Sequence, residues 1–141
     1  MTDPRPLPPD VRDFLDAPRF AVVATVGADG TPHQAVAWYR LVADGLVLNS
    51  REGRRWPTDL RRDRRVSIAV EDGYDNVVLE GEVDIDDDQE RAQADIAEMA
   101  CRYHADDPAR ARRLIEEEFR RQRRVSFVLR PQRVHAELGE G

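Results

Sequence analysis

The chain has 141 residues, of which 40% are hydrophobic and 35% charged, and its formal net charge at pH 7 is −6. That length fits one domain with one modest core, and the acidic balance argues against a general nucleic-acid binder. The single cysteine, Cys101, excludes an intrachain disulfide. No run of about 18 apolar residues is present, which excludes a membrane-spanning helix, and the proline-rich start does not resemble a secretory signal. We therefore expect a cytoplasmic protein with neither a nucleic-acid nor a membrane partner.

Short apolar segments separated by turn signals make up the first half of the chain. Pro8 and Pro9 are suited to start a short helix that ends before Pro18, with Phe14 and Leu15 facing the core. The segments that follow are rich in β-branched residues and are predicted to be strands. They cover residues 19–26, 32–42, 46–50 and 65–72.

Residues 77–86 show the clearest period of two residues in the sequence. One face of this segment is apolar and the opposite face is mostly acidic. The apolar positions are Val77, Leu79, Gly81, Val83 and Ile85. Because only one face can be buried, the pattern predicts an antiparallel strand with a solvated side.

The spacing of apolar residues becomes helical over residues 87–122, and Pro108 divides this segment into a helical pair. The acids at 86–88 are placed to cap the first helix and to complement its dipole. Strand character returns at residues 125–131 and 133–138.

Together these elements predict a small antiparallel barrel with helices packed outside it. We expect a single domain over residues 1–141, in which residues 1–18 form an N-terminal extension and the short helix. No internal repeat and no shift in composition indicates a second domain.

Motifs for metal binding and for nucleophilic catalysis are missing from the sequence. The three histidines, at 33, 104 and 135, lie far apart and form no HExxH pattern, so we expect no metal site. None of the three serines sits in a GxSxG elbow. Cys101 falls within the helical pattern and is expected to be a small packing residue.

The arginine-rich stretch of residues 51–65 is the strongest chemical signal in the sequence. A predicted strand ends just before it, and Pro57 is suited to be the first residue of a short helix. A helix amino terminus offers free N–H groups and a partial positive charge, and Arg54 and Arg55 would add charged donors beside it. The pattern predicts a phosphate site. The alternative is that these arginines only solvate the helix and pair with nearby acids, namely Glu52, Asp59 and Asp63.

The chain resembles the split-barrel flavin-binding superfamily typified by pyridoxamine 5′-phosphate oxidase, and within it the small branch that uses the deazaflavin coenzyme F420. The resemblance spans residues 11–134, and the G-x-P-H, D-L-R-R-D-x-R-V-S and E-G-x-V motifs follow one another in the family's order. Four segments carry it: RFAVVATVGADGTPHQAVAWY, LVLNSREGRRWPTDLRRDRRVSIAVEDGY, LEGEVDI and RRVSFVLRPQRV. The fold that it implies is mainly β with α, a split antiparallel β-barrel with flanking helices.

The resemblance also implies a set of cofactor-binding residues. The phosphate and ring-binding segment corresponds to Asn49, Ser50, Arg54, Arg55 and Asp59. The strand whose backbone lies against the ring corresponds to Val36, Ala37 and Trp38. Tyr74 matches an aromatic residue that borders the cofactor from the neighbouring subunit, and Arg124 matches a basic residue near the cofactor tail. Trp56 departs from the family pattern, because a lysine often stands at its position.

The function implied by the resemblance is an oxidoreductase that transfers hydride from reduced coenzyme F420 to an unsaturated small-molecule acceptor, in a homodimer with sites between the subunits. A proton could come from Tyr39, Tyr74, His33 or solvent. The alternatives are an FMN-dependent oxidoreductase of the same fold, a non-catalytic protein that binds a flavin, deazaflavin or tetrapyrrole, and a dimeric barrel without a cofactor. The tryptophan and Arg-His tail of true pyridoxamine-phosphate oxidases has no counterpart, so we do not expect vitamin B6 oxidation.

Overall fold

The computed structural model describes residues 3–139, so residues 1, 2, 140 and 141 of the predicted domain lie outside the described residues. The strands are β1 (Ala21–Val26), β2 (Pro32–Ala37), β3 (Tyr39–Val42), β4 (Gly45–Arg51), β5 (Arg65–Asp72), β6 (Asp75–Asp86), β7 (Arg124–Leu129) and β8 (Arg133–Glu137). The helices are α1 (Pro9–Asp16), α2 (Arg55–Arg62), α3 (Gln89–Tyr103) and α4 (Pro108–Arg113). A π-helical turn (Leu114–Glu118) and a 3₁₀ turn (Phe119–Arg121) follow α4.

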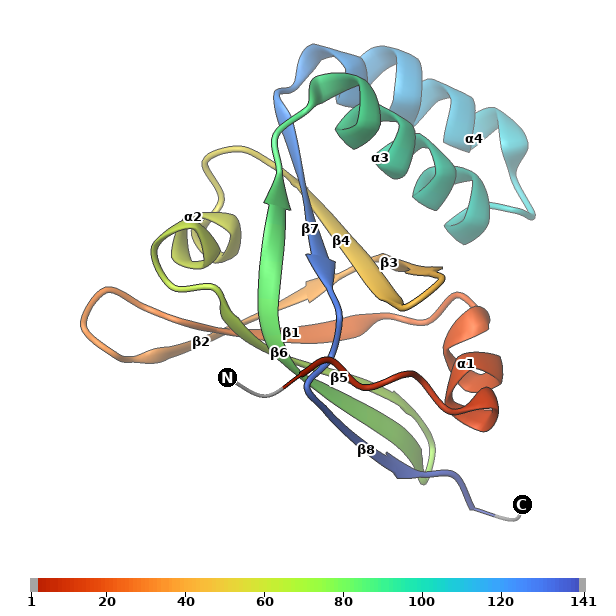
Figure 1. Cartoon of the computed structure of the whole chain (residues 1–141). Coiled ribbons are helices and arrows are strands. Elements are labelled where there is room, and N and C mark those ends of the chain that lie inside the picture. Colours follow the sequence, from red (N-terminus) through yellow and green to blue (C-terminus); the bar gives the residue numbers. More distant parts are fainter. Residues whose placement is uncertain (1–2, 140–141) are drawn as a thin grey trace.

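The strands form one antiparallel sheet in the order β2-β1-β5-β6-β7-β4-β3, with β8 paired to β6. The long strand β6 joins the two halves, because residues 75–82 pair with β5 and residues 83–86 pair with β7. Figure 1 shows the sheet curling into a half-barrel, with α3 and α4 side by side at one end and α1 and α2 on opposite flanks. The predicted split-barrel fold is therefore confirmed.

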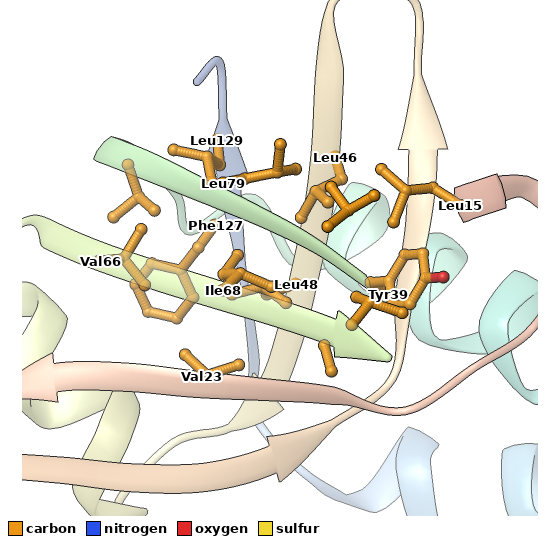
Figure 2. Packing of buried hydrophobic residues seen from close by; sticks show 14 of the residues in the cluster. Leu15, Val23, Tyr39, Leu46, Leu48, Val66, Ile68, Leu79, Phe127 and Leu129 are labelled. Carbon is orange, nitrogen blue, oxygen red and sulfur yellow. The ribbon is translucent and has the colours of Figure 1, made fainter. Parts of the chain in front are cut away.

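The core fills the inside of the curved sheet and contains side chains from nearly every strand (Figure 2). Val77, Leu79 and Val83 are at most 1% exposed, whereas Glu82 and Asp84 on the opposite face are exposed. The two-residue period of β6 thus predicted which side is buried. Leu15 of α1 is fully buried, as predicted, and Phe14 is partly buried against the same core.

The predicted strand over residues 32–42 is broken at Trp38 into β2 and β3, which pair with different strands. The break has a long-range cause. The ring of Trp38 stacks on Tyr103 of α3, with 5.0 Å between the centroids, and the amide of Tyr39 donates to Tyr103 Oη at 3.1 Å. Because α3 is distant in sequence, no local pattern predicts this bend.

Two further expectations were wrong in detail. Cys101 is exposed rather than packed, because the buried side of α3 runs through Ala92, Ile96, Met99 and Ala100, and the next residue turns away from it. Pro57 is the third residue of α2 rather than the first.

The capping expectation is confirmed, since the Asp88 side chain accepts a hydrogen bond from the backbone amide of Arg91 at 2.9 Å. Within residues 3–139, none of the helices is both long enough and apolar enough to cross a membrane.

Candidate functional site

A cavity of about 340 Å³ lies between β2, β4, the start of α2, the middle of α3 and the turns after α4. One side of the cavity is apolar and includes Phe20, Val36 and Trp38, while the other side is basic and includes Arg54 and Arg124. A larger open groove of about 540 Å³ runs along Gly81 on another part of the molecule. We consider the smaller cavity the candidate site because it gathers most of the residues that the sequence predicted.

Seven of the predicted cofactor-binding residues line this cavity. They are Val36, Ala37, Trp38, Asn49, Arg54, Trp56 and Arg124. Four others do not line it, and they are Ser50, Arg55, Asp59 and Tyr74. The sequence analysis overlooked several lining residues, of which Phe20, Arg51, Glu118, Phe119 and Gln122 are polar or aromatic. Arg51 could have been found within the arginine-rich stretch, whereas the last three depend on how the turns after α4 fold back.

Arg124 forms the basic end of the cavity and is itself buried, with 6% of its surface exposed. Its Nε donates to Asn49 Oδ1 at 3.0 Å and its Nη1 donates to Gln122 Oε1 at 2.5 Å. The guanidinium also lies 4.9 Å from the ring centroid of Phe119. Burial, with smaller contributions from the charges of Arg54 and Arg51, lowers the pKa of Arg124 to about 10. The two side chains that accept hydrogen bonds from this arginine are therefore neutral, and the charges that act on its pKa are those of other arginines.

The acids near the arginine-rich stretch pair with arginines outside the cavity. Glu52 pairs with Arg61, Asp59 pairs with Arg62 at 2.9 Å, and Asp63 pairs with Arg65 at 2.6 Å. The predicted alternative is thus found in part, since these acids pair with Arg61, Arg62 and Arg65 of the same stretch but not with Arg54 or Arg55. Across residues 3–139, no ion pair within 4.0 Å involves any of the cavity arginines, Arg51, Arg54 and Arg124.

Helix α2 points its amino terminus at the same side of the cavity. Its N-cap residue is Arg54, and no side chain caps the first turn. Gly53 precedes it with a φ of +94°, a left-handed conformation that favours glycine and allows the tight turn out of β4. The first-turn amides thus add donors and a partial positive charge beside Arg54. This set of donors fits an anion such as a phosphate.

Aromatic side chains form much of the remaining wall. Trp38 is held between Tyr103 and the edge of Phe119, whose centroid lies 6.4 Å away. Trp56 is 5% exposed and packs on Phe127 with 5.6 Å between the centroids. Its indole Nε1 is buried and has no hydrogen-bond partner among the described residues. Flat apolar walls of this kind suit a planar ring system.

Asp59 lies outside the cavity and holds α2 in place. Its carboxylate accepts hydrogen bonds from Thr25 Oγ1 at 2.9 Å, from His33 Nδ1 at 2.7 Å and from Arg62 Nη2 at 2.9 Å. Burial acts to raise the pKa of Asp59, but the hydrogen bonds from His33, Arg62 and Thr25 outweigh it and hold that pKa below its usual value. The contacts join α2 to the β1–β2 hairpin, and so fix the helix that carries Arg54.

The three side chains considered as proton donors lie outside the cavity of this chain. Tyr39 is fully buried, donates to the carbonyl of Ala17 at 3.2 Å, and has its pKa raised by burial to about 12. Tyr74 is 99% exposed. His33 is bound to Asp59. Glu118 supplies the carboxyl group of the cavity lining. Nowhere in residues 3–139 do three His, Cys, Asp or Glu side chains gather as a metal site would require.

Comparisons with known proteins agree with the fold of the chain. The family model described as pyridoxamine 5′-phosphate oxidase matches residues 7–137. No curated protein matches the chain significantly by sequence. A solved structure of a conserved hypothetical protein from Mycobacterium tuberculosis is 23% identical, with a TM-score of 0.75 and coverage of 100% of this chain and 96% of that one.

Two other solved structures carry functional descriptions. A protein named F420 reductase is 22% identical, with a TM-score of 0.68 and coverage of 92% of this chain and 98% of its own. The haem storage protein HutZ from Vibrio cholerae is 20% identical, with a TM-score of 0.67 and coverage of 93% and 94%, respectively. Likeness at these identities establishes the fold that the proteins share.

Proposed function

Since the chain belongs to the pyridoxamine 5′-phosphate oxidase family, we propose that its cavity binds a phosphate-bearing flavin-type cofactor, with coenzyme F420 as the first candidate. The protein would then act as an oxidoreductase that transfers hydride from the reduced deazaflavin to an unsaturated organic acceptor. FMN is the alternative cofactor for the same cavity.

The observation that carries this proposal is the unpaired charge of the cavity arginines. Some arginines elsewhere on the molecule, such as Arg40 and Arg130, are paired with carboxylates, whereas Arg124 is buried at 6% exposure and forms no ion pair within the described residues. A buried charge without a counterion is costly, so Arg124 is best explained by an anion that binds beside it. The uncapped start of α2 supports the same anion position.

The residues present fit such a cofactor, and their roles follow from their chemistry. Arg54, Arg124 and the first turn of α2 would hold the phosphate, while Val36 and Trp38 would lie along the ring. When bound, a reduced deazaflavin supplies the hydride. The protein's own contribution is to orient the ring, to exclude water with its apolar wall, and to leave an open side for the acceptor.

A haem-binding function is the competing proposal, because one structural relative is a haem storage protein. Haem iron is usually held by a histidine, cysteine, methionine or tyrosine. The thirteen residues that line the cavity in the described part of the chain include none of these four types. The arginine cluster and the aromatic wall favour the flavin-type cofactor.

We also propose that a second copy of the chain covers the open side of the cavity. Phe20 and Val36 are each 63% exposed and also line the cavity, and Val22, at 37%, lies directly opposite Val36 in the sheet. Such a contiguous apolar patch is unusual on a monomer. A two-fold partner seated on it would bury these side chains and enclose the cofactor. In that arrangement the exposed Tyr74 would be available to the partner's site.

The proposal is tested by titrating the purified protein separately with coenzyme F420 and with FMN while following the fluorescence of each. We expect saturable binding of F420, and hydride transfer from reduced F420 to an activated alkene as loss of the reduced cofactor's absorbance. Binding of FMN alone would support the alternative cofactor. Binding of haem with neither of the other two would overturn the proposal.

A further inference from the structure

We propose that Asp95, which does not line the cavity, is a positioning residue that sets the direction of the hydrogen bonds leading to Arg124. The inference rests on the proposed function, because it concerns how the anion-binding guanidinium is held. It assigns a role to a carboxylate on α3 that the cofactor itself would not touch.

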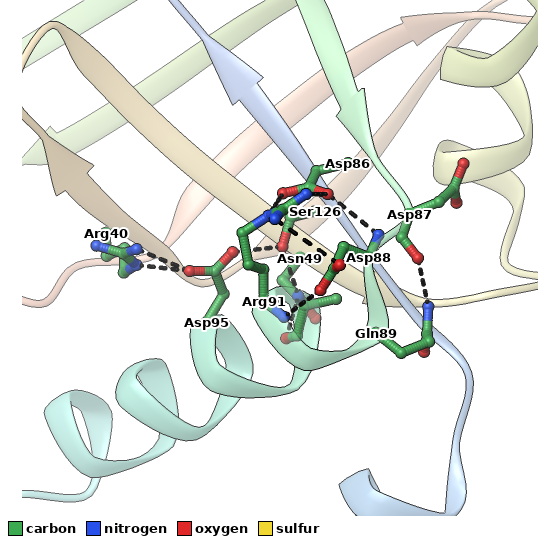
Figure 3. Close-up of polar contacts among 10 residues, drawn as sticks. Arg40, Asn49, Asp86, Asp87, Asp88, Gln89, Arg91, Asp95 and Ser126 are labelled. Carbon is green, nitrogen blue, oxygen red and sulfur yellow. Dashed lines mark hydrogen bonds and ion pairs between the residues drawn. The ribbon is translucent and has the colours of Figure 1, made fainter.

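A continuous chain of buried polar side chains links Asp95 to the cavity, and Figure 3 shows its first members. Ser126 Oγ donates to Asp95 Oδ2 at 2.6 Å. Asn49 Nδ2 donates to Ser126 Oγ at 3.0 Å, and Asn49 Oδ1 accepts from Arg124 Nε at 3.0 Å. All four residues are at most 9% exposed. Asn49 and Ser126 face each other across β4 and β7, so the sheet register fixes this contact.

The carboxylate at the end of this chain fixes the direction of its first hydrogen bond, and the later bonds are arranged to match it. An ionised carboxylate can only accept, so the hydroxyl proton of Ser126 must point toward Asp95. The Ser126 oxygen is then left as an acceptor for the Asn49 amide nitrogen. The same nitrogen also donates to the carbonyl of Ala92 at 2.9 Å. The Asn49 oxygen therefore faces Arg124, where a donor-only guanidinium needs an acceptor.

Arg40 explains why an amide could not replace Asp95. Its Nε and Nη2 both donate to Asp95 Oδ1, at 3.1 and 2.7 Å (Figure 3). In an Asp95→Asn variant the amide oxygen would stay with Arg40, and the amide nitrogen would face Ser126. The Ser126 oxygen would then accept from two nitrogen donors, those of Asn49 and of the new amide, and the Ser126 hydroxyl proton would lose its acceptor. The changed hydrogen bonds at Ser126 would disturb the orientation of its neighbour Asn49, which accepts the hydrogen bond from Arg124.

The positioning role of Asp95 predicts a change in phosphate affinity opposite to the change that the loss of its charge alone would cause. Removing a negative charge near an anion site should tighten anion binding. The hydrogen-bond chain predicts weaker binding instead, because Arg124 loses its fixed orientation. We expect Asp95→Asn to weaken binding of inorganic phosphate about three- to tenfold, the range of coupling within one hydrogen-bond network.

The experiment compares Asp95→Asn with a matched control, Glu98→Gln. Glu98 lies on the same helix and contacts the same arginine, with Glu98 Oε2 3.4 Å from Arg40 Nε, but it does not contact Ser126. Phosphate binding is measured by calorimetry on the full chain. The control should leave the affinity unchanged. A double variant that adds Ser126→Ala to Asp95→Asn should bind no more weakly than Asp95→Asn alone, because both changes break the same chain of hydrogen bonds. A merely structural role for Asp95 predicts further loss.

A second readout requires no ligand. In the unliganded protein, the Arg124 Nε–H resonance should shift in Asp95→Asn, stay in place in Glu98→Gln, and shift no further in the double variant than in Asp95→Asn alone. If wild-type protein binds no phosphate, the proposed function is wrong, and this resonance still decides the positioning role. If Asp95→Asn does not fold, Ser126→Ala alone should shift the same resonance. An unmoved resonance, or phosphate binding that is as tight in Asp95→Asn as in wild type, would overturn the inference.

Discussion

Arg124 donates its Nε–H to Asn49 Oδ1 across 3.0 Å, so a buried guanidinium meets a neutral amide rather than a carboxylate. The amide satisfies one donor and leaves the positive charge uncompensated. Arg61, in contrast, is bound by both Glu52 and Asp87, which raise its pKa. Arg124 thus keeps a positive charge that an external anion could neutralise, whereas the charge of Arg61 is already neutralised by a surface ion-pair network.

Replacing Asn49 by aspartate should remove the uncompensated positive charge of Arg124. In Asn49→Asp a carboxylate would stand beside Arg124, pair with it, and repel an incoming phosphate. We expect the affinity for coenzyme F420 or FMN to fall by more than about tenfold. The melting temperature should also fall, because aspartate cannot make the two hydrogen bonds that the Asn49 amide donates to Ala92 and Ser126. Asn76→Asp is the matched control, because it makes the same change in a residue outside the cavity lining. Equal losses in both variants would indicate a diffuse charge effect.

Arg54 and Arg55 allow a sharper test of the phosphate position. Only Arg54 lines the cavity, and a charge-assisted hydrogen bond contributes roughly 1.5–3 kcal/mol. Arg54→Ala should therefore weaken cofactor binding by about tenfold or more, whereas Arg55→Ala should change it little. Fluorescence titration of both variants measures the difference. If Arg55→Ala weakens binding as much as Arg54→Ala, the phosphate lies elsewhere along α2.

Asp59 is expected to make stability depend on pH. Its pKa is held below the usual value in the folded protein, so its stabilising contribution is present above the unfolded pKa of about 3.9 and is lost as pH falls through the folded pKa. Asp59→Asn should lower the free energy of unfolding at pH 7 by about 1–3 kcal/mol. The gap between wild type and variant in urea denaturation should narrow below about pH 4. A gap that stays constant down to pH 3 would contradict this assignment.

The sequence predicted those parts of the fold that depend on local pattern. The alternation along β6 identified its buried side, and the acids before α3 identified its cap. The break at Trp38 could not be predicted, because it depends on stacking against Tyr103 and on a hydrogen bond across 64 positions of the chain. Contacts of that kind leave no periodic signal near either residue.

The candidate site was predicted in part, for a similar reason. A motif gives the order of residues but not the direction of each side chain. Arg54 is the N-cap of α2 and reaches the cavity, whereas Arg55 is the first helical residue and points elsewhere. The chain from Asp95 to Asn49 joins residues that no motif places together, since Asp95, Asn49 and Ser126 lie far apart in the sequence and meet only through the packing of α3 on the sheet.

The predicted dimer can be tested through the apolar patch of Phe20, Val22 and Val36. Introducing a charge by Val36→Asp would place a carboxylate in the centre of a buried interface, which strongly disfavours association. Wild-type protein at micromolar concentration should sediment at twice the chain mass of 16.1 kDa, and Val36→Asp should sediment at the chain mass. Ala136→Asp on the exposed β8 is the control and should remain dimeric. A wild-type protein that sediments as a monomer would show that the patch is not covered by a second copy, and the cavity would then be closed by the cofactor alone.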